Sequence, residues 1–193
     1  MAPSAPSSSL QETLNLSKPT LSSSSHPPYL HYLTSQILHD LKYQHDWTCL
    51  TIHTHSPVSF LPLSRPIISG LPPRCAYIHP DEQVEILKAE HATGKKIIHR
   101  AEREWVLPTH IQEKMTLRKF AEVFDGLSVL PPGGEDEGVR KEREGNVEEE
   151  SSTAGEKWRG EKRQKRLLLS TLHDDSTVTY YIMHDGIVKP RQN

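Results

Sequence analysis

The stretch from Lys165 to the C-terminus constrains the fold most, because it has the pattern of two β-strands joined by a short acidic turn. An apolar run spans residues 167–172, and residues 178–183 are rich in Val, Thr, Tyr and Ile, which favour a pleated sheet. Between them, residues 174–176 (Asp-Asp-Ser) offer short polar side chains that can hydrogen-bond a turn backbone. We therefore predict a β-hairpin that carries no catalytic side chain.

The second strand of this hairpin has apolar groups on both of its faces. Successive side chains of a strand point to opposite sides of the sheet. One face therefore carries Val178, Tyr180 and Ile182, and the other carries Thr179, Tyr181 and Met183. A single helix layer can cover one face, so the other face needs a second layer or another subunit.

Three helices and several short strands are predicted upstream of the hairpin. Apolar residues at helical spacing indicate helices over residues 29–44, over residues 80–90 after a Pro-Asp-Glu start, and from Thr116. The buried stripe expected for the third helix is Leu117, Phe120, Ala121, Phe124 and Leu127.

Strands are expected at residues 47–53, 75–78 and 105–107, the last ending at Pro108. Residues 60–69 contain two prolines and predict a strand that is broken or at an edge. The fold class is therefore α/β, a small mixed sheet packed by two to three helices.

The domain organisation follows from uneven composition. Residues 1–28 are rich in Ser and Pro, and residues 128–157 are rich in Pro, Gly and Glu. Such segments bury too little apolar surface to offset the entropy of ordering, so we expect a disordered tail and a disordered acidic insertion. The remaining residues, 29–127 and 158–193, are predicted to form one domain.

Several functional classes are disfavoured by what the sequence lacks. Two separated cysteines, Cys49 and Cys75, predict neither a disulfide framework nor a Cys-rich metal site, which favours a reducing intracellular compartment. His53 and His55 would share a strand face, but a third ligand at zinc spacing is missing nearby. We expect no cofactor, no metal and no membrane span.

Metal-free RNA cleavage would need a general base, a general acid and a cation near the phosphate. Tyr77, His91 or His99, and Lys95 or Lys96 could supply such a set. Their spacing does not require it, and ordinary surface roles are favoured.

A basic run follows the acidic insertion and includes Arg159, Lys162, Arg163, Lys165 and Arg166. Three readings remain open for it. The run could be a solvated flank of the insertion, a nuclear localisation signal, or a contact for RNA phosphates.

Three segments together resemble a known family. Residues 104–127 (EWVLPTHIQEKMTLRKFAEVFDGL), 166–193 and 77–90 are similar to the small non-catalytic subunit of eukaryotic tRNA-splicing endonuclease, the Sen-fifteen type, in its fungal form. The resemblance covers residues 29–127 and 158–190. The most specific part is D-D-S-T-V-x-Y-Y followed by D-G-I-V-x-P.

The resemblance implies the fold of the C-terminal domain of tRNA-intron endonucleases and a chain without the catalytic Tyr-His-Lys triad. It implies a nuclear heterotetramer in which this chain pairs with a catalytic Sen-thirty-four type subunit. That complex excises introns from pre-tRNA and leaves a 2',3'-cyclic phosphate and a 5'-hydroxyl. In isolation the chain could form a homodimer.

The resemblance also implies two assembly contacts. In related archaeal enzymes, C-terminal strands pair across a dimer interface, and an acidic loop docks into a basic pocket of the opposite dimer. The residues that match these contacts here are Asp174 and Asp175 for the loop and Val178, Tyr180, Tyr181, Ile182 and Met183 for the strand. The alternatives to an assembly subunit are an independent metal-free ribonuclease that uses histidines and a plain RNA-binding module.

Overall fold

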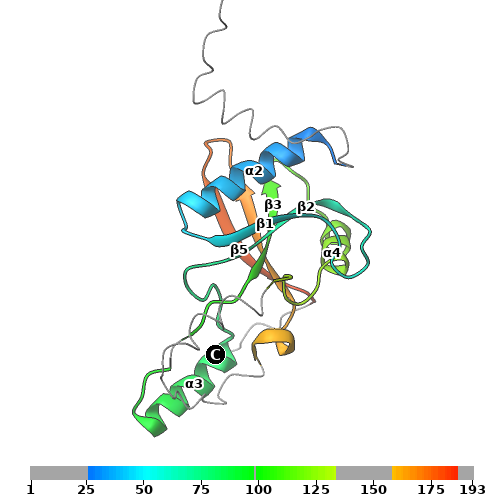
Figure 1. Cartoon of the computed structure of the whole chain (residues 1–193). Helices are drawn as coiled ribbons and strands as arrows, with labels where there is room; N and C mark the ends of the chain where they lie inside the picture. Colours follow the sequence, from blue (N-terminus) through cyan, green and yellow to red (C-terminus); the bar gives the residue numbers. More distant parts are fainter. Residues whose placement is uncertain (1–25, 98, 134–157, 187–193) are drawn as a thin grey trace, which may run out of the picture.

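A five-stranded mixed sheet lies at the centre of the computed structural model, which describes residues 26–97, 99–133 and 158–186 (Figure 1). In chain order the elements are α2 (Pro28–Tyr43), β1 (Thr48–His55), β2 (Pro62–Leu71), α3 (Pro80–Thr93), β3 (Glu104–His110), α4 (Leu117–Gly126), a short 3-10 turn η2 (Gly160–Lys162), β4 (Arg166–Leu172) and β5 (Val178–His184). The strand order is β1-β2-β3-β4-β5, antiparallel except for the parallel pair β3–β4. The predicted fold class is confirmed.

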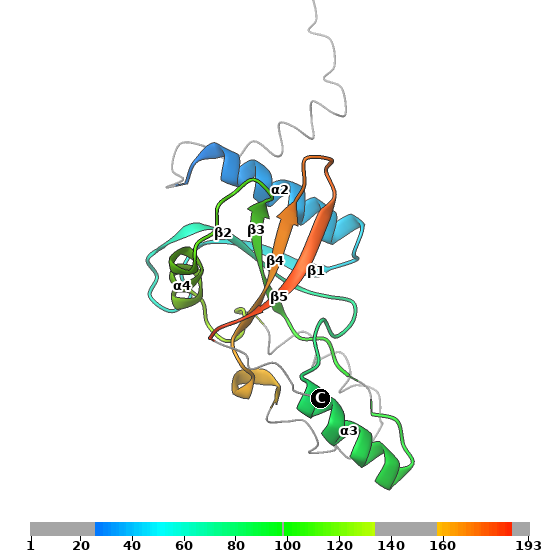
Figure 2. The same cartoon turned by 180° about the vertical axis from the view of Figure 1, so that it is seen from behind.

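The two faces of the sheet are covered by different helices (Figure 2). One row of neighbouring residues, Ile68, Val106 and Leu168, faces α2 and packs with its leucines and with Ile37. Residues one position along, such as Ile67 and Leu107, belong to a second core formed with α4. This alternation is the period of two that every strand imposes on its side chains.

The predicted interruption of residues 60–69 is wrong, because β2 is a continuous inner strand. The recorded β2–β3 pairs end at Ile68 opposite Val106, and the same register would set Pro66 opposite Pro108. Neither proline has an N–H to donate, so the ladder stops where both occur. Pro108 interrupts only the pairing with β2 and does not end β3, which pairs with β4 as far as His110.

Three further boundaries differ from the predictions. Residues 75–78 form no strand. The helix predicted to end near residue 90 continues to Thr93, where Gly94 ends it with a left-handed φ of 67°. Leu117, at 88% exposed, and Ala121 are exposed instead of buried. Leu117 begins α4 about 10 Å along the axis from Phe124, which packs on the sheet.

The predicted C-terminal hairpin is confirmed by β4, β5 and the seven residue pairs that join them. Its turn is closed by the His173 N–H, which donates to the Thr177 carbonyl at 2.8 Å. Ser176 takes a left-handed φ of 68°, the conformation that lets a short loop follow the twist of two strands.

The predicted tail and insertion fall mostly outside the described residues. At their margins, His26 is buried and its Nε2 lies 2.6 Å from the Leu63 carbonyl oxygen, while Trp105 donates to the Ser128 carbonyl at 3.0 Å. In the ranges the structure covers, none of the helices is both long and apolar enough to cross a bilayer.

Candidate subunit interface and buried ion-pair cluster

Strand β5 is an edge of the sheet, so one side of its backbone faces away from β4. Val178, Tyr180 and Ile182 pack against the core beneath α2 and are half-buried. On the opposite face Tyr181 is 60% exposed, beside the half-buried Met183. The two faces of the predicted interface strand therefore differ. One is covered by this chain's own helix, and the other is partly open.

The Tyr180 hydroxyl fixes β5 to α2. It donates a hydrogen bond of 2.6 Å to Oδ2 of Asp40, a residue that is 7% exposed. Burial and the hydrogen bond to the Asp40 carboxylate raise the pKa of Tyr180 far above its usual value, so it remains a donor at any physiological pH. His45 lies 3.5 Å from the same carboxylate.

The two aspartates of the turn have different environments. Asp175 accepts from the Thr177 hydroxyl at 2.7 Å and from its N–H at 3.0 Å, and these bonds lower the pKa of Asp175. Asp174 accepts from Gln112 Nε2 at 3.0 Å and lies 3.6 Å from His110, yet its side chain is 65% exposed. Asp175 therefore stabilises its own turn, whereas Asp174 presents a carboxylate to solvent.

The basic run is not the solvated cluster that its composition suggests. The side chains of Arg163 and Arg166 are 1% and 6% exposed. Both bind Glu104, with Arg163 Nη2 at 3.0 Å from Oε2 and Arg166 Nη2 at 2.6 Å from Oε1. Glu102 adds a second carboxylate 2.9 Å from Arg163 Nη1. The expected exposure is therefore wrong for these two arginines, which join the starts of β3 and β4.

The other members of the run are also partly engaged. Arg159 pairs with Glu82 of α3 at 2.7 Å, and Lys165 donates to the Phe124 carbonyl at 2.8 Å. Only Lys162 of the five is an exposed residue. Whether Arg159, Lys162 or Lys165 contacts RNA or a nuclear import receptor stays a prediction.

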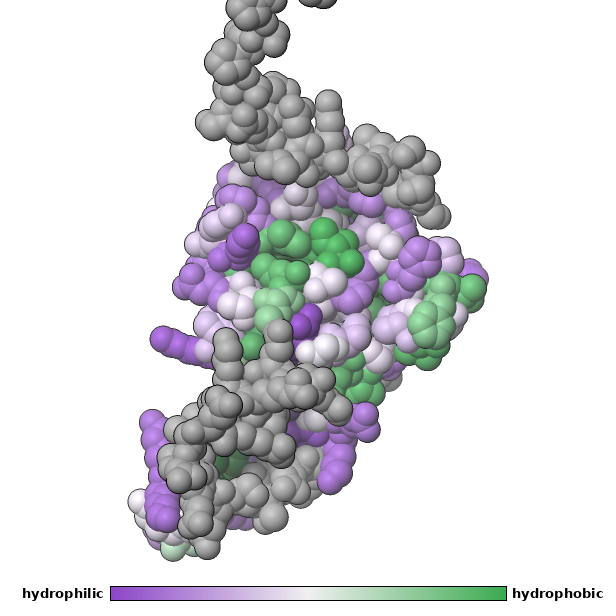
Figure 3. All heavy atoms as spheres, viewed as in Figure 1, coloured by the Kyte–Doolittle hydropathy of each residue, from purple (hydrophilic) through white to green (hydrophobic). Residues whose placement is uncertain are grey.

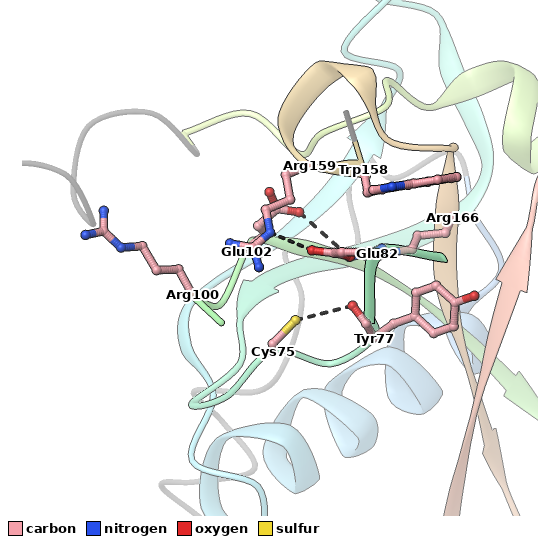
Figure 4. A pocket seen from close by; sticks show the side chains of 8 residues that line it. All are labelled: Cys75, Tyr77, Glu82, Arg100, Glu102, Trp158, Arg159 and Arg166. Atoms are coloured by element: carbon pink, nitrogen blue, oxygen red, sulfur yellow. Dashed lines mark hydrogen bonds and ion pairs between the residues drawn. The ribbon is translucent and has the colours of Figure 1, made fainter. Parts of the chain in front are cut away.

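A cavity lies beside the ion-pair cluster, between Tyr77, Glu82, Arg159 and Arg166 (Figure 4). Its volume is about 10 Å³, room for roughly one water molecule. A nucleotide needs a pocket of several hundred Å³. Burial raises the pKa of the neighbouring Cys75 thiol, which disfavours the nucleophilic thiolate.

The catalytic set considered from sequence is not brought together. Tyr77 precedes the first residue of α3, whereas His91, Lys95 and Lys96 lie at its other end, about 20 Å away for a helix of this length. The alternative His99 lies nearer the start of α3, with its Nδ1 3.3 Å from the Arg159 that binds Glu82, but both lysines of the set remain at the far end. Tyr77 instead packs against His184, with ring centroids 4.9 Å apart. The residues covered by the structure also contain no cluster of three or more His, Cys, Asp or Glu side chains that could bind a metal.

Two half-buried histidines couple folding to pH. Burial, and then the charge of Arg103, lowers the pKa of His53 below its usual value of 6.5. Burial, Arg166 and His79 lower the pKa of His184 in the same way. In the folded protein these rings stay neutral at a pH where the unfolded chain is already protonated.

Stability should therefore be full above pH 6.5 and fall as the pH drops below it, because the unfolded state then binds more protons. We expect the urea midpoint to decrease between pH 7.5 and 5.5, and the decrease to be smaller for the double variant His53→Gln with His184→Gln. The exposed His55 serves as the matched control, and its change to Gln should leave the pH dependence as in wild type. Equal pH dependence in the double variant and wild type would contradict this assignment.

Sequence reasoning missed the ion pairs made by the half-buried Glu102 and the buried Glu104. Their spacing of two places both side chains on one side of extended backbone, which is a weak local signal. Their partners lie about 60 positions further along the chain, as in the Arg163–Glu104 pair. Only the parallel pairing of β3 and β4 brings them together.

Comparison with known proteins identifies the family. The sequence model of the family described as "Sen15 protein" matches residues 36–141 and 146–193. A similar curated protein is the "Probable tRNA-splicing endonuclease subunit tsp-1" of Neurospora crassa, 46% identical over 165 residues, which are 86% of this chain and 67% of the relative. The family model covers the described domain from residue 36 onward, and the two matches confirm the resemblance carried by the sequence motifs: the chain belongs to the Sen15 protein family.

Proposed function

We propose that this chain is a non-catalytic subunit of the tRNA-splicing endonuclease. In this role it pairs with a catalytic subunit, within a heterotetramer, for the removal of introns from pre-tRNA in the nucleus. The observation that carries the proposal is the 46% identity to a protein named as a subunit of that enzyme. The fold supports it through the edge of the sheet formed by β5 and through the partly open face of that strand.

The edge strand β5 supplies the contact for the partner. An edge strand exposes backbone donors and acceptors that a strand of another chain can pair with. Tyr181 lies opposite Leu169 of β4, and the half-buried side chains of Leu169 and Met183 form an apolar surface beside it. An exposed tyrosine on such a surface is a typical interface anchor.

A structural role is favoured over an independent ribonuclease because the candidate catalytic groups are separated or neutralised. Arg166 is the cation beside Tyr77 and His184, but Glu104 binds it, and the adjoining cavity excludes a nucleotide. Burial acts to lower the pKa of Arg166, and the hydrogen bonds and charge of Glu104 outweigh it and raise that pKa. The positive charge of Arg166 is therefore paired with a buried carboxylate of the same chain.

Asp174 is the residue of the turn that fits a docking role. Asp174→Lys should leave the chain folded, because the side chain is 65% exposed and surface changes usually alter stability by less than about 0.5 kcal/mol. It should weaken assembly of the heterotetramer, because it places a positive charge against the basic pocket that the resemblance implies. Sedimentation of the co-expressed subunits measures this.

The matched control is Asp125→Lys, the same charge change at an exposed position on α4. It should sediment as wild type. An unchanged heterotetramer with Asp174→Lys would exclude docking through this turn. A plain RNA-binding module, the remaining alternative, predicts RNA affinity without any co-purifying subunit.

A further inference from the structure

Helix α3 extends away from the sheet and, with the residues that flank it, forms an arm (residues 79–97). Figures 1 and 2 show α3 running outward from the body, with its C-terminal end farthest from the sheet. The part of this arm that is visible in Figure 3 is mostly hydrophilic, although Leu87 is 55% exposed. A projecting helix of 14 residues reaches about 20 Å beyond its base.

The base of the arm is held firmly. His79 caps α3 by accepting from the Asp81 N–H, and Glu82 completes the capping box. The His79 ring stacks on Trp158 with centroids 4.0 Å apart and an interplanar angle of 9°. Glu82, 4% exposed, pairs with Arg159 at 2.7 Å. The direction of the arm is therefore fixed by several contacts.

The far end of the arm is also ordered by hydrogen bonds. The Gly94 N–H donates to the Glu90 carbonyl at 2.8 Å and ends the helix. The chain then turns back, and the Ile97 N–H donates to the Glu90 carboxylate at 2.8 Å. This carboxylate is used to hold the turn rather than to pair with a lysine.

Charge is unevenly distributed along the arm. Acidic residues occupy the first turn, at Asp81 and Glu82, and Glu85 lies in the middle of the helix. The opposite end, called the arm tip, carries exposed basic side chains: Lys88, His91, Lys95 and Lys96. Lys88 and His91 are three residues apart and share the outer face of α3. Within the described ranges, no ion pair is recorded for the three lysines, in contrast to Arg159, Arg163 and Arg166.

We propose that the arm tip binds the RNA phosphate backbone, through the ammonium groups of Lys88, Lys95 and Lys96. This rests on the proposed function, in which the complex acts on pre-tRNA. Clustered lysines on an ordered projection bind phosphates as point charges and release counterions, without reading the base sequence.

The experiment measures binding of a fluorescent intron-containing pre-tRNA to the endonuclease assembly purified through this chain. The transcript carries 2'-deoxy sugars at both splice sites, so that cleavage through the 2'-hydroxyl cannot occur. Each phosphate contact changes log K by about 0.7–0.9 per decade of salt, so the variant Lys88→Gln, Lys95→Gln, Lys96→Gln should reduce the salt slope by roughly 2–3. If wild type and variant bind equally at 1 M salt, where the electrostatic contribution is lost, these slopes predict roughly 50- to 170-fold weaker binding of the variant at 0.15 M salt.

Two variants serve as controls. Replacing the three lysines with Arg should keep both affinity and slope, since the charges remain. Lys42→Gln with Lys114→Gln, which removes two exposed lysines on other elements, should bind as wild type.

If the triple Gln variant assembles normally and its pre-tRNA affinity and salt slope are unchanged, the inference about the arm tip is wrong, while the proposed function is unaffected. Loss of assembly in that variant would identify the arm tip as a protein contact and overturn it as well. Failure of the wild-type chain to assemble with endonuclease subunits would instead overturn the proposed function.

Discussion

Replacing Glu104 with Gln should lower the free energy of unfolding by about 3–5 kcal/mol, the effect of breaking a buried ion pair by removing one partner. Glu104 is 1% exposed, and its two carboxylate oxygens accept from both Arg163 and Arg166. Without its charge, two buried guanidinium groups would depend on Glu102 alone, whose side chain is 23% exposed.

Urea unfolding of the full chain measures this effect, read as a lower midpoint with an unchanged slope. Glu122→Gln is the matched control, because Glu122 pairs with Arg118 at 3.6 Å on the surface of α4, where both side chains are more than half exposed. Such a pair contributes about 0.5 kcal/mol or less.

A double variant keeps the test informative if Glu104→Gln fails to fold. Glu104→Gln with Arg166→Met removes one charge of each sign, and its loss of stability should be smaller than the sum of the two single losses. A loss below about 1 kcal/mol for Glu104→Gln, or strict additivity in the double variant, would contradict the role of the cluster in joining β3 to β4.

The adjacent residues Tyr180 and Tyr181 should respond in opposite ways to mutation. Tyr180→Phe removes the donor to the buried Asp40 carboxylate and should reduce stability by about 1.5–3 kcal/mol. Tyr181→Ala, on the partly open face, should leave the urea midpoint nearly unchanged. It should weaken binding of the catalytic subunit by roughly 30-fold or more, the effect of losing an aromatic interface anchor.

Each variant is the control for the other, because the two positions lie on the same strand. Binding is measured by titration of the catalytic subunit, with the midpoint of urea unfolding measured in parallel. If Tyr181→Ala merely unfolds the domain, or if it binds the partner as wild type does, the open face of β5 is not the interface.

The parts of the fold that the sequence predicts well depend on neighbours in the chain. The hairpin could be predicted because its alternation and its Asp-Asp-Ser turn lie within one short segment. Helix α3 could be located because Pro80 and the acidic residues after it are a local start signal. The exposure of Leu117 was missed because spacing along a helix does not reveal where the supporting sheet ends.

The parts that could not be predicted depend on pairing between distant segments. Pro66 is tolerated inside β2 because the ladder to β3 ends before it, which only the register reveals. Arg163 and Arg166 have the composition of a solvated basic run, yet their partners come from the start of β3. The sequence places the proposed interface on β5, but only the position of α2 distinguishes the covered Tyr180 from the open Tyr181.

The most direct measurement is cleavage of an intron-containing pre-tRNA by this chain, purified once alone and once together with the subunits that bind it. The proposed function predicts that the isolated chain leaves the transcript intact and that the assembly excises the intron. Specific cleavage by the isolated chain, abolished by a single change such as His184→Ala, would contradict the proposal of a non-catalytic subunit.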